Sequence, residues 1–181
     1  KFEATSDTDG NINSYVIIEN GGMFNGIHRL DSYWGELNQL SSGSACVAMG
    51  RNAAVAVTTA SNLVAIGHNA LYTNTGDYNT AVGENALFAN TSGTNNTAIG
   101  RGALDVNTTG SSNVAIGVSA LDANTTANSN TAVGNSSLGS NTTGAYNVAL
   151  GQNAGLNNTT GGDITAIGYN ALAANTTANS N

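Results

Sequence analysis

Apolar and polar residues alternate along most of this chain in a short pattern that repeats. Tripeptides made of Ala, one of Ile, Val, Leu or Met, and Gly recur with a 17-residue period, except for one interval that is shorter by a single position. A fixed short period of this kind indicates a solenoid or a repeat array. The glycines that end these tripeptides are Gly50, Gly67, Gly83, Gly100, Gly117, Gly134, Gly151 and Gly168.

Each repeat contains two short apolar segments separated by polar segments rich in Gly and Asn. Residues 96–112, for example, read NTAIGRGALDVNTTGSS. The apolar segments are too short for helices, and flanking Gly and Asn are typical of strands joined by turns. The sequence therefore predicts an all-β fold, a parallel β-solenoid or β-roll with 17-residue turns. We expect two short strands in each turn and turns stacked about 4.8 Å apart.

Side-chain alternation along the strands predicts which residues face the interior. In the first strand the aliphatic residues share one face, and Ala and Gly share the other. In the second strand Leu104 and Val106 share one face. We therefore predict a thin core in which an aliphatic column packs against a leucine column. This predicted core contains Ile99, Leu104, Ile116 and Leu121.

Asn-Thr-Thr triplets recur at the predicted corners of the solenoid. Asn tolerates left-handed backbone angles, and stacked identical Asn side chains hydrogen-bond to one another. We therefore predict a structural ladder along the corners. The triplets are also N-glycosylation sequons, but the corner geometry explains them without a glycan. The predicted ladder contains Asn107, Asn124, Asn141, Asn158 and Asn175.

The predicted outward face of the first strand carries only Ala and Gly, whereas the outward face of the second strand varies. A face limited to tiny residues indicates the close approach of another surface. One turn also buries too few large side chains to offset easily the entropy of ordering all of its residues. We therefore predict a homotrimer, intertwined or packed around this face. The candidate interface residues are Ala98, Gly100, Ala115, Gly117, Ala132 and Gly134.

Composition narrows the classes of partner. Charged residues make up 8% of the chain, only four are basic, and the net charge is −7. No basic patch can form, so we expect no binding to nucleic acid. No apolar run reaches the length of a membrane helix, so we expect no membrane insertion. The single cysteine, Cys46, excludes an intrachain disulfide.

Residues 1–44 differ from the repeats. They hold six of the eleven acidic residues and the only tryptophan. We predict a non-repeat N-terminal cap or neck, with a strand over residues 14–18 and a short helix whose apolar stripe contains Ile27, Leu30, Trp34 and Leu37. Residues 45–181 carry about eight repeats, and we expect the repeats to continue beyond residue 181.

The repeats contain no convincing catalytic or metal-binding pattern. Asp105 and Asp122 share a column, but they are expected on a convex surface without a cleft. His28 and His68 have no second ligand at metal spacing. We therefore expect neither an enzyme nor a cofactor or metal site.

Tyr72 and Phe88 occupy one outward column in successive turns. They are predicted to stack into an exposed aromatic strip. This strip is a candidate contact for a cell-surface glycan. The alternative is that the two rings cover the edge of a neighbouring chain.

The repeat resembles those of two known families. Residues 113–117 (NVAIG) and 63–67 (LVAIG) resemble turns in the heads of trimeric autotransporter adhesins, although the adhesin turns are shorter. The 17-residue unit is similar to repeats in the tail fibres of tailed bacteriophages. The resemblance covers roughly residues 46–181 and implies a left-handed parallel β-roll wound around a threefold axis.

The function that this resemblance implies is structural. The chain would be an extracellular fibre or adhesin segment, a rigid trimeric shaft for attachment to a host or surface, located on a virion tail fibre or a cell surface. A receptor or cell-surface glycan would be its partner. A subunit of a self-polymerising extracellular filament is the alternative. The regular Thr column is also compatible with a third function, that of an ice-binding solenoid.

Overall fold

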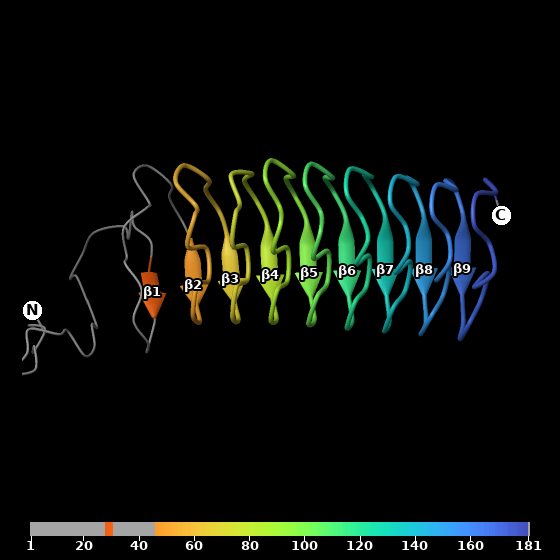
Figure 1. The fold of residues 1–181 in the computed structure, drawn as a ribbon, viewed down its shortest axis with the longest axis horizontal. Coiled ribbons are helices and arrows are strands. Elements are labelled where there is room, and N and C mark those ends of the chain that lie inside the picture. Colours follow the sequence, from red (N-terminus) through yellow and green to blue (C-terminus); the bar gives the residue numbers. More distant parts are fainter. Residues whose placement is uncertain (1–27, 31–45, 181) are drawn as a thin grey trace, which may run out of the picture.

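The structure is a computed structural model that describes residues 28–30 and 46–180. Its strands form one nine-stranded parallel sheet in chain order, and no helix occurs among the described residues (Figure 1). This confirms the predicted parallel β-solenoid with its 17-residue repeat. The strands are β1 (His28–Leu30), β2 (Val47–Met49), β3 (Val64–Ile66), β4 (Thr80–Val82), β5 (Thr97–Ile99), β6 (Val114–Ile116), β7 (Thr131–Val133), β8 (Val148–Leu150) and β9 (Thr165–Ile167).

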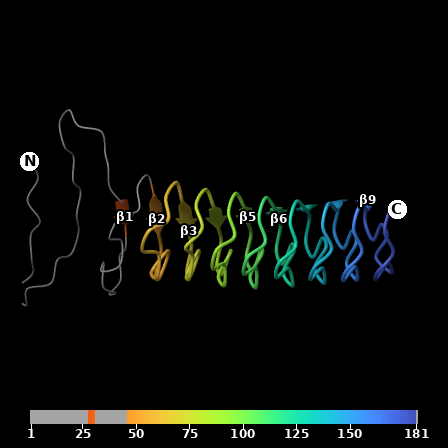
Figure 2. The ribbon, with the colours of Figure 1, turned by 90° about the horizontal axis from the view of Figure 1, so that it is seen from above.

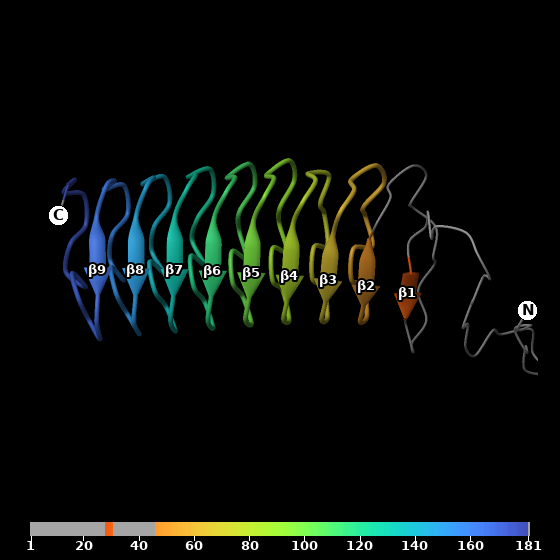
Figure 3. The same ribbon diagram turned by 180° about the vertical axis from the view of Figure 1, so that it is seen from behind.

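Successive strands pair without any slip in register. In β5 and β6, for example, Ala98 lies opposite Ala115 and Ile99 opposite Ile116. The one shorter turn keeps the same register because its missing residue is a corner Thr, in the short corner at Asn74. Figures 1 and 3 show the turns stacked side by side from opposite directions, and Figure 2 shows the strands along one side of the stack.

Each turn contains one strand rather than the predicted two. The second apolar segment has irregular backbone, with Leu104 in the left-handed region at φ 53°. Its amides still bond to the next turn, as the Leu104 N–H donates to the Ala120 carbonyl at 3.0 Å. The left-handed residue breaks side-chain alternation, so Ala103 and Leu104 both point inward and Val106 points outward. The prediction of a second strand was therefore wrong.

Alanine, not isoleucine, forms the strand side of the core. Ala98 and Ala115 are fully buried, whereas Ile99 and Ile116 are 39% and 37% exposed. The predicted core is therefore correct for Leu104 and Leu121 and wrong for the two isoleucines. The buried strand column is Ala48, Ala65, Ala81, Ala98, Ala115, Ala132, Ala149 and Ala166.

The narrow interior explains this reversal. The opposite wall already projects Ala and Leu inward from consecutive positions, and two asparagine columns fill the rest of the cross-section. Only a methyl group fits between them on the strand side, since protein interiors are close-packed. The candidate interface residues Ala98, Ala115 and Ala132 consequently lie in the core of their own chain.

The glycines of the supposed interface also pack within the chain. A Cβ on Gly117 would lie 2.5 Å from the carbonyl oxygen of Gly134 in the next turn. Gly100 and Gly134 meet the following turn in the same way. The Ala/Gly pattern therefore reflects the close stacking of turns, and its assignment to a surface between chains was wrong.

The corner asparagines form the predicted ladder. Asn124 Nδ2 donates to Asn107 Oδ1 at 2.8 Å, and Asn158 Nδ2 donates to Asn141 Oδ1 at 2.9 Å. Asn175 Nδ2 extends the ladder to Asn158 Oδ1 at 3.0 Å. None of these residues has a positive φ, so the ladder rests on hydrogen bonding rather than on left-handed backbone.

A second buried asparagine ladder was not predicted. The Asn113 backbone N–H donates to Asn96 Oδ1 at 3.0 Å, and the Asn113 Nδ2 donates to the Ala127 carbonyl at 2.8 Å. This column gives way to Leu63 and Ile164 towards its two ends. Buried amides that hydrogen-bond to the turns on either side favour one register between turns. The second ladder contains Asn79, Asn96, Asn113, Asn130 and Asn147.

The solenoid sheet extends into the non-repeat region. His28–Leu30 pair in parallel with β2, with Arg29 opposite Ala48. The helix predicted around Ile27 to Leu37 is therefore wrong at these three residues. The strand predicted over residues 14–18 and the rest of the proposed cap or neck lie outside the described residues.

Candidate functional site

The outward side chains of β2–β9 form a continuous surface, which we call the apolar strand face. It has two columns that run along the stack, one of Val and Thr and one of aliphatic residues and Met. Neither column contains a charged residue. The first is Val47, Val64, Thr80, Thr97, Val114, Thr131, Val148 and Thr165, and the second is Met49, Ile66, Val82, Ile99, Ile116, Val133, Leu150 and Ile167.

The apolar strand face is unusual for a surface in contact with water. Val47, Met49, Val148 and Leu150 are each at least 40% exposed. Soluble monomers rarely expose a contiguous apolar patch that runs the length of the molecule, and such patches mark interaction sites. The face was missed in the sequence because alternation fixes which residues share a face without fixing which face is inside.

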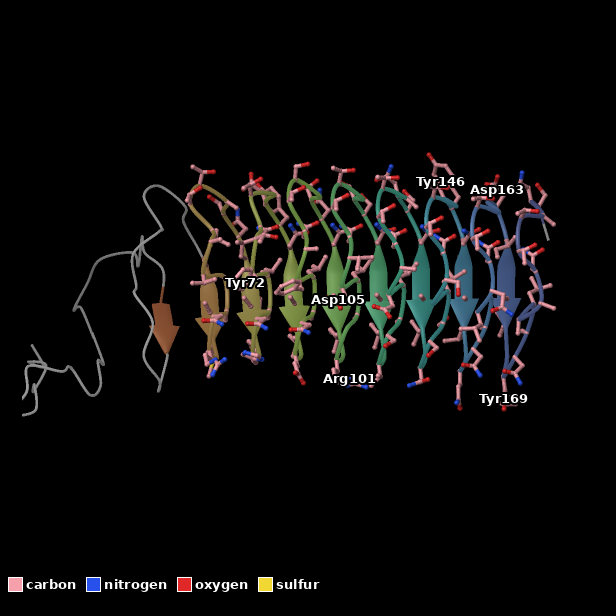
Figure 4. The ribbon with its side chains drawn as sticks, viewed as in Figure 1. Tyr72, Arg101, Asp105, Tyr146, Asp163 and Tyr169 are labelled. Carbon is pink, nitrogen blue, oxygen red and sulfur yellow. The ribbon has the colours of Figure 1, made fainter. Side chains whose placement is uncertain are left out.

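The aromatic pair on the opposite wall stacks as predicted. The ring centroids of Tyr72 and Phe88 lie 5.1 Å apart, and the ring planes differ by 28°. At this separation the rings overlap face to face, so each covers one face of the other. Both side chains are partly buried, and Figure 4 places Tyr72 on the same strip of the stack as Asp105. This geometry favours packing, and a glycan contact at the pair stays a prediction.

Asp105 and Asp122 continue the same column. Burial raises the pKa of Asp105, and the negative charge of Asp122 raises it further. Burial also raises the pKa of Asp122, and the Arg101 guanidinium partly offsets that rise. Among residues 46–180 no group of three or more His, Cys, Asp or Glu side chains is placed to hold a metal ion. Burial is therefore the main cause of the raised pKa values of both carboxyl groups.

The raised pKa values of Asp105 and Asp122 predict a pH-dependent stability. Because folding raises both pKa values, the native state takes up protons before the unfolded chain does as pH falls from 7 towards about 4. The contribution of the pair to stability should therefore increase on acidification. Asp105→Asn/Asp122→Asn should stabilise the protein at pH 7, by less than about 1 kcal/mol because both carboxyls are partly exposed. Thermal unfolding of both proteins between pH 4 and 7 measures the effect, and parallel curves would contradict it.

Arg101, which Figure 4 labels at the lower edge of the stack, belongs to a column that carries charged residues in several turns. The column contains Arg51, His68, Glu84 and Arg101 in successive turns. His68 Nδ1 lies 4.0 Å from Glu84 Oε1, and both side chains are well exposed. An exposed pair of this kind contributes little to stability. His68 is therefore a surface residue.

The corner threonines already use their hydroxyl groups within the chain. The Oγ1 atoms of Thr108 and Thr125 donate to the carbonyls of Thr125 and Thr142 in the next turns, at 3.0 and 3.2 Å. The sequon asparagines of the ladder are likewise buried and bonded. The hydroxyl group of the first Thr in these corners is therefore not free to join an array of exposed hydroxyls. The side chains of Asn107, Asn124 and Asn141 are likewise not open to receive a glycan.

Two exposed tyrosines lie at the corner that precedes the strands and were not singled out from the sequence. Tyr78 and Tyr146 are 60% and 65% exposed, and Figure 4 shows Tyr146 at the upper edge of the stack beside Asp163. Both stand in a column otherwise made of Asn, Ser and Asp. This departure from the column's composition is the signal that would have identified them.

No protein-family model, curated protein or solved structure matches this chain. No helix among the described residues is long and apolar enough to cross a membrane.

Proposed function

We propose that this chain is a segment of an extracellular structural fibre, a rigid homotrimeric shaft that serves attachment to a host or surface. The observation that carries the proposal is the apolar strand face. It runs along the whole stack of β2–β9 and contains no charged residue. On this face Ile99 and Ile116 are more than a third exposed. Covering it with identical faces of two further copies removes this apolar area from water.

The interior of the stack supports a mechanical role. Two buried asparagine ladders and continuous backbone bonding tie every turn to its neighbours. Each turn contacts only adjacent turns, so length can be added without changing the cross-section. A rod of this kind spaces and presents whatever it carries. Its proposed location is a virion tail fibre or a cell surface.

The apolar strand face replaces the Ala/Gly face as the proposed contact between copies. Val and Ile columns on a flat parallel sheet can interdigitate with the same columns of neighbouring copies, as the two inner faces of a β-sandwich do. The threefold arrangement itself comes from the family resemblance. The filament alternative depends on residues 1–44, most of which lie outside the described residues.

The test compares two double variants with matched exposure. Ile99→Glu/Ile116→Glu puts two carboxylates on the apolar strand face, where the parent side chains are 39% and 37% exposed. Val106→Glu/Val118→Glu puts two on other surfaces, at 41% and 36% exposed. Burying unpaired charges in an interface is costly. We expect the first variant to sediment as a monomer and the second to remain a trimer like the wild type.

Three results would refute this assembly. These are a monomeric wild-type protein, a trimer in the Ile99→Glu/Ile116→Glu variant, and dissociation of both variants alike. Circular dichroism of each variant shows whether its turns are still folded. Both substitutions replace outward side chains, so the interior of each turn is unchanged.

A further inference from the structure

One residue at an equivalent position in each turn forms what we call the corner column, and before β3–β9 this residue directly precedes a buried Asn, Leu or Ile. Its members are all exposed, and each has a left-handed backbone with φ between 56° and 61°. From Tyr78 to Ser180 their amides donate to carbonyls in the preceding turn, so the column is a continuous ridge. The corner column is Asn62, Tyr78, Asn95, Ser112, Ser129, Tyr146, Asp163 and Ser180.

Tyrosine is out of place on this ridge. A left-handed backbone costs an ordinary L-residue roughly 1–2 kcal/mol, and Asn and Asp bear it best because their short side chains bond locally. Leu104 adopts the same conformation but is fully buried in return. Tyr78 and Tyr146 are largely exposed, and among residues 46–180 neither ring stacks on another. A local preference violated without structural gain points to function.

We propose that the corner column is a docking surface for a neutral polysaccharide, with Tyr78 and Tyr146 as its two stacking platforms. This inference rests on the proposed attachment function and names the class of its partner. Four turns separate the two tyrosines, which at about 4.8 Å per turn places them about 19 Å apart. Asn95, Ser112 and Ser129 lie between them and present amide and hydroxyl groups.

The chemistry of the ridge fits sugar rings. The faces of a tyrosine ring are apolar and its hydroxyl is polar, which matches the mixed character of a pyranose. The repeat of an extended pyranose chain is close to the spacing between turns, so successive sugars can meet successive corner residues. Unlike Tyr72 and Phe88, whose rings stack on each other, the two corner tyrosines stack on no ring among residues 46–180 and are more than half exposed.

Charge selects against acidic glycans. The ridge and its immediate neighbours in the chain contain no Lys or Arg, and their charged residues are Asp77, beside Tyr78, and Asp163, beside Tyr146 in the next turn. Carboxylates near both ends of the ridge repel a polyanion. The ligand is therefore expected to be uncharged.

The experiment is affinity electrophoresis of the folded protein through native gels that contain dextran, mannan, amylose or the anionic alginate. We expect retardation by at least one neutral polysaccharide and none by alginate. Tyr78→Asn/Tyr146→Ser installs residue types that other turns carry at this position, and it should weaken that retardation at least tenfold without lowering the Tm. Tyr169→Asn is the control, since Tyr169 is 71% exposed but lies outside the corner column.

Each other outcome overturns the inference. If no neutral polysaccharide retards the wild-type protein, or if only alginate does, the proposed ligand class is wrong. If the double variant is retarded as strongly as the wild type, the proposed binding site is wrong. A lower Tm or a changed oligomeric state in the double variant makes the tyrosines part of the fold or of the contact between copies. If the protein is a trimer that binds no neutral polysaccharide, this inference fails while the proposed shaft function still stands.

Discussion

Gly117→Ala is expected to unfold the middle of the stack or to lower its stability by at least about 3 kcal/mol. Gly117 has φ 134°, a backbone region that only glycine occupies readily. An added Cβ would lie 2.5 Å from the carbonyl oxygen and 2.6 Å from the carbonyl carbon of Gly134. Both atoms belong to backbone that the strand register holds in place, so the clash cannot be relieved locally.

Gly102→Ser provides the matched control for this change. Gly102 also has a positive φ, 66°, but the one atom near its Cβ direction is Ser119 Oγ at 3.6 Å. Ser119 itself adopts φ 54° in the next turn, so serine fits this position. Urea unfolding of both variants should separate them clearly. Similar midpoints for Gly117→Ala and the wild type would show that the turns can move apart.

The period and the parallel stacking could be predicted from the sequence because they depend on repetition alone. Glycines that recur at one fixed interval require equivalent positions to stack, whatever the cross-section. The corner ladder followed for the same reason, since identical Asn residues at one position must lie above one another. The stacking of Tyr72 on Phe88 likewise needs only their shared column.

The orientation of the faces could not be predicted from the pattern. Alternation places Ala98 on one side of β5 and Ile99 on the other, but both assignments satisfy it. The deciding factor is the left-handed Leu104, which projects inward beside Ala103 and leaves room for only a methyl group opposite. A leucine with positive φ is rare, and no local sequence preference indicates it.

The same reversal of the inward and outward faces explains why the proposed contact between copies is the apolar strand face rather than the Ala/Gly face. Once the Ala column is inside, the aliphatic column, which was predicted to lie in the core, must be outside, where it forms part of the apolar strand face. Ala115→Glu is accordingly a change in the core and would report on folding. The two tyrosines of the corner column depart from its Asn, Ser and Asp composition, which the sequence shows, but the left-handed backbone that makes this departure costly is known only from the structure.

Asn124→Ala is the second change expected to have a large effect, a loss of about 2–4 kcal/mol. The substitution removes a bond of 2.8 Å from Asn124 Nδ2 to Asn107 Oδ1 and one of 3.2 Å to the Ala127 carbonyl. It also removes the acceptor of Asn141 Nδ2. These partner groups are buried, so no water replaces the lost bonds, and the vacated volume adds the cost of a small cavity.

Asn135→Ala is the control for the ladder, because Asn135 is an exposed asparagine that belongs to neither ladder. Its replacement should change stability by no more than about 0.5 kcal/mol. Comparing the two variants separates the cost of leaving buried hydrogen-bond partners unpaired from the cost of losing an amide side chain anywhere. Denaturant unfolding and hydrogen exchange at the amides of the neighbouring turns measure it. Equal stability of the two variants would mean that the ladder sets register without contributing to the free energy of unfolding.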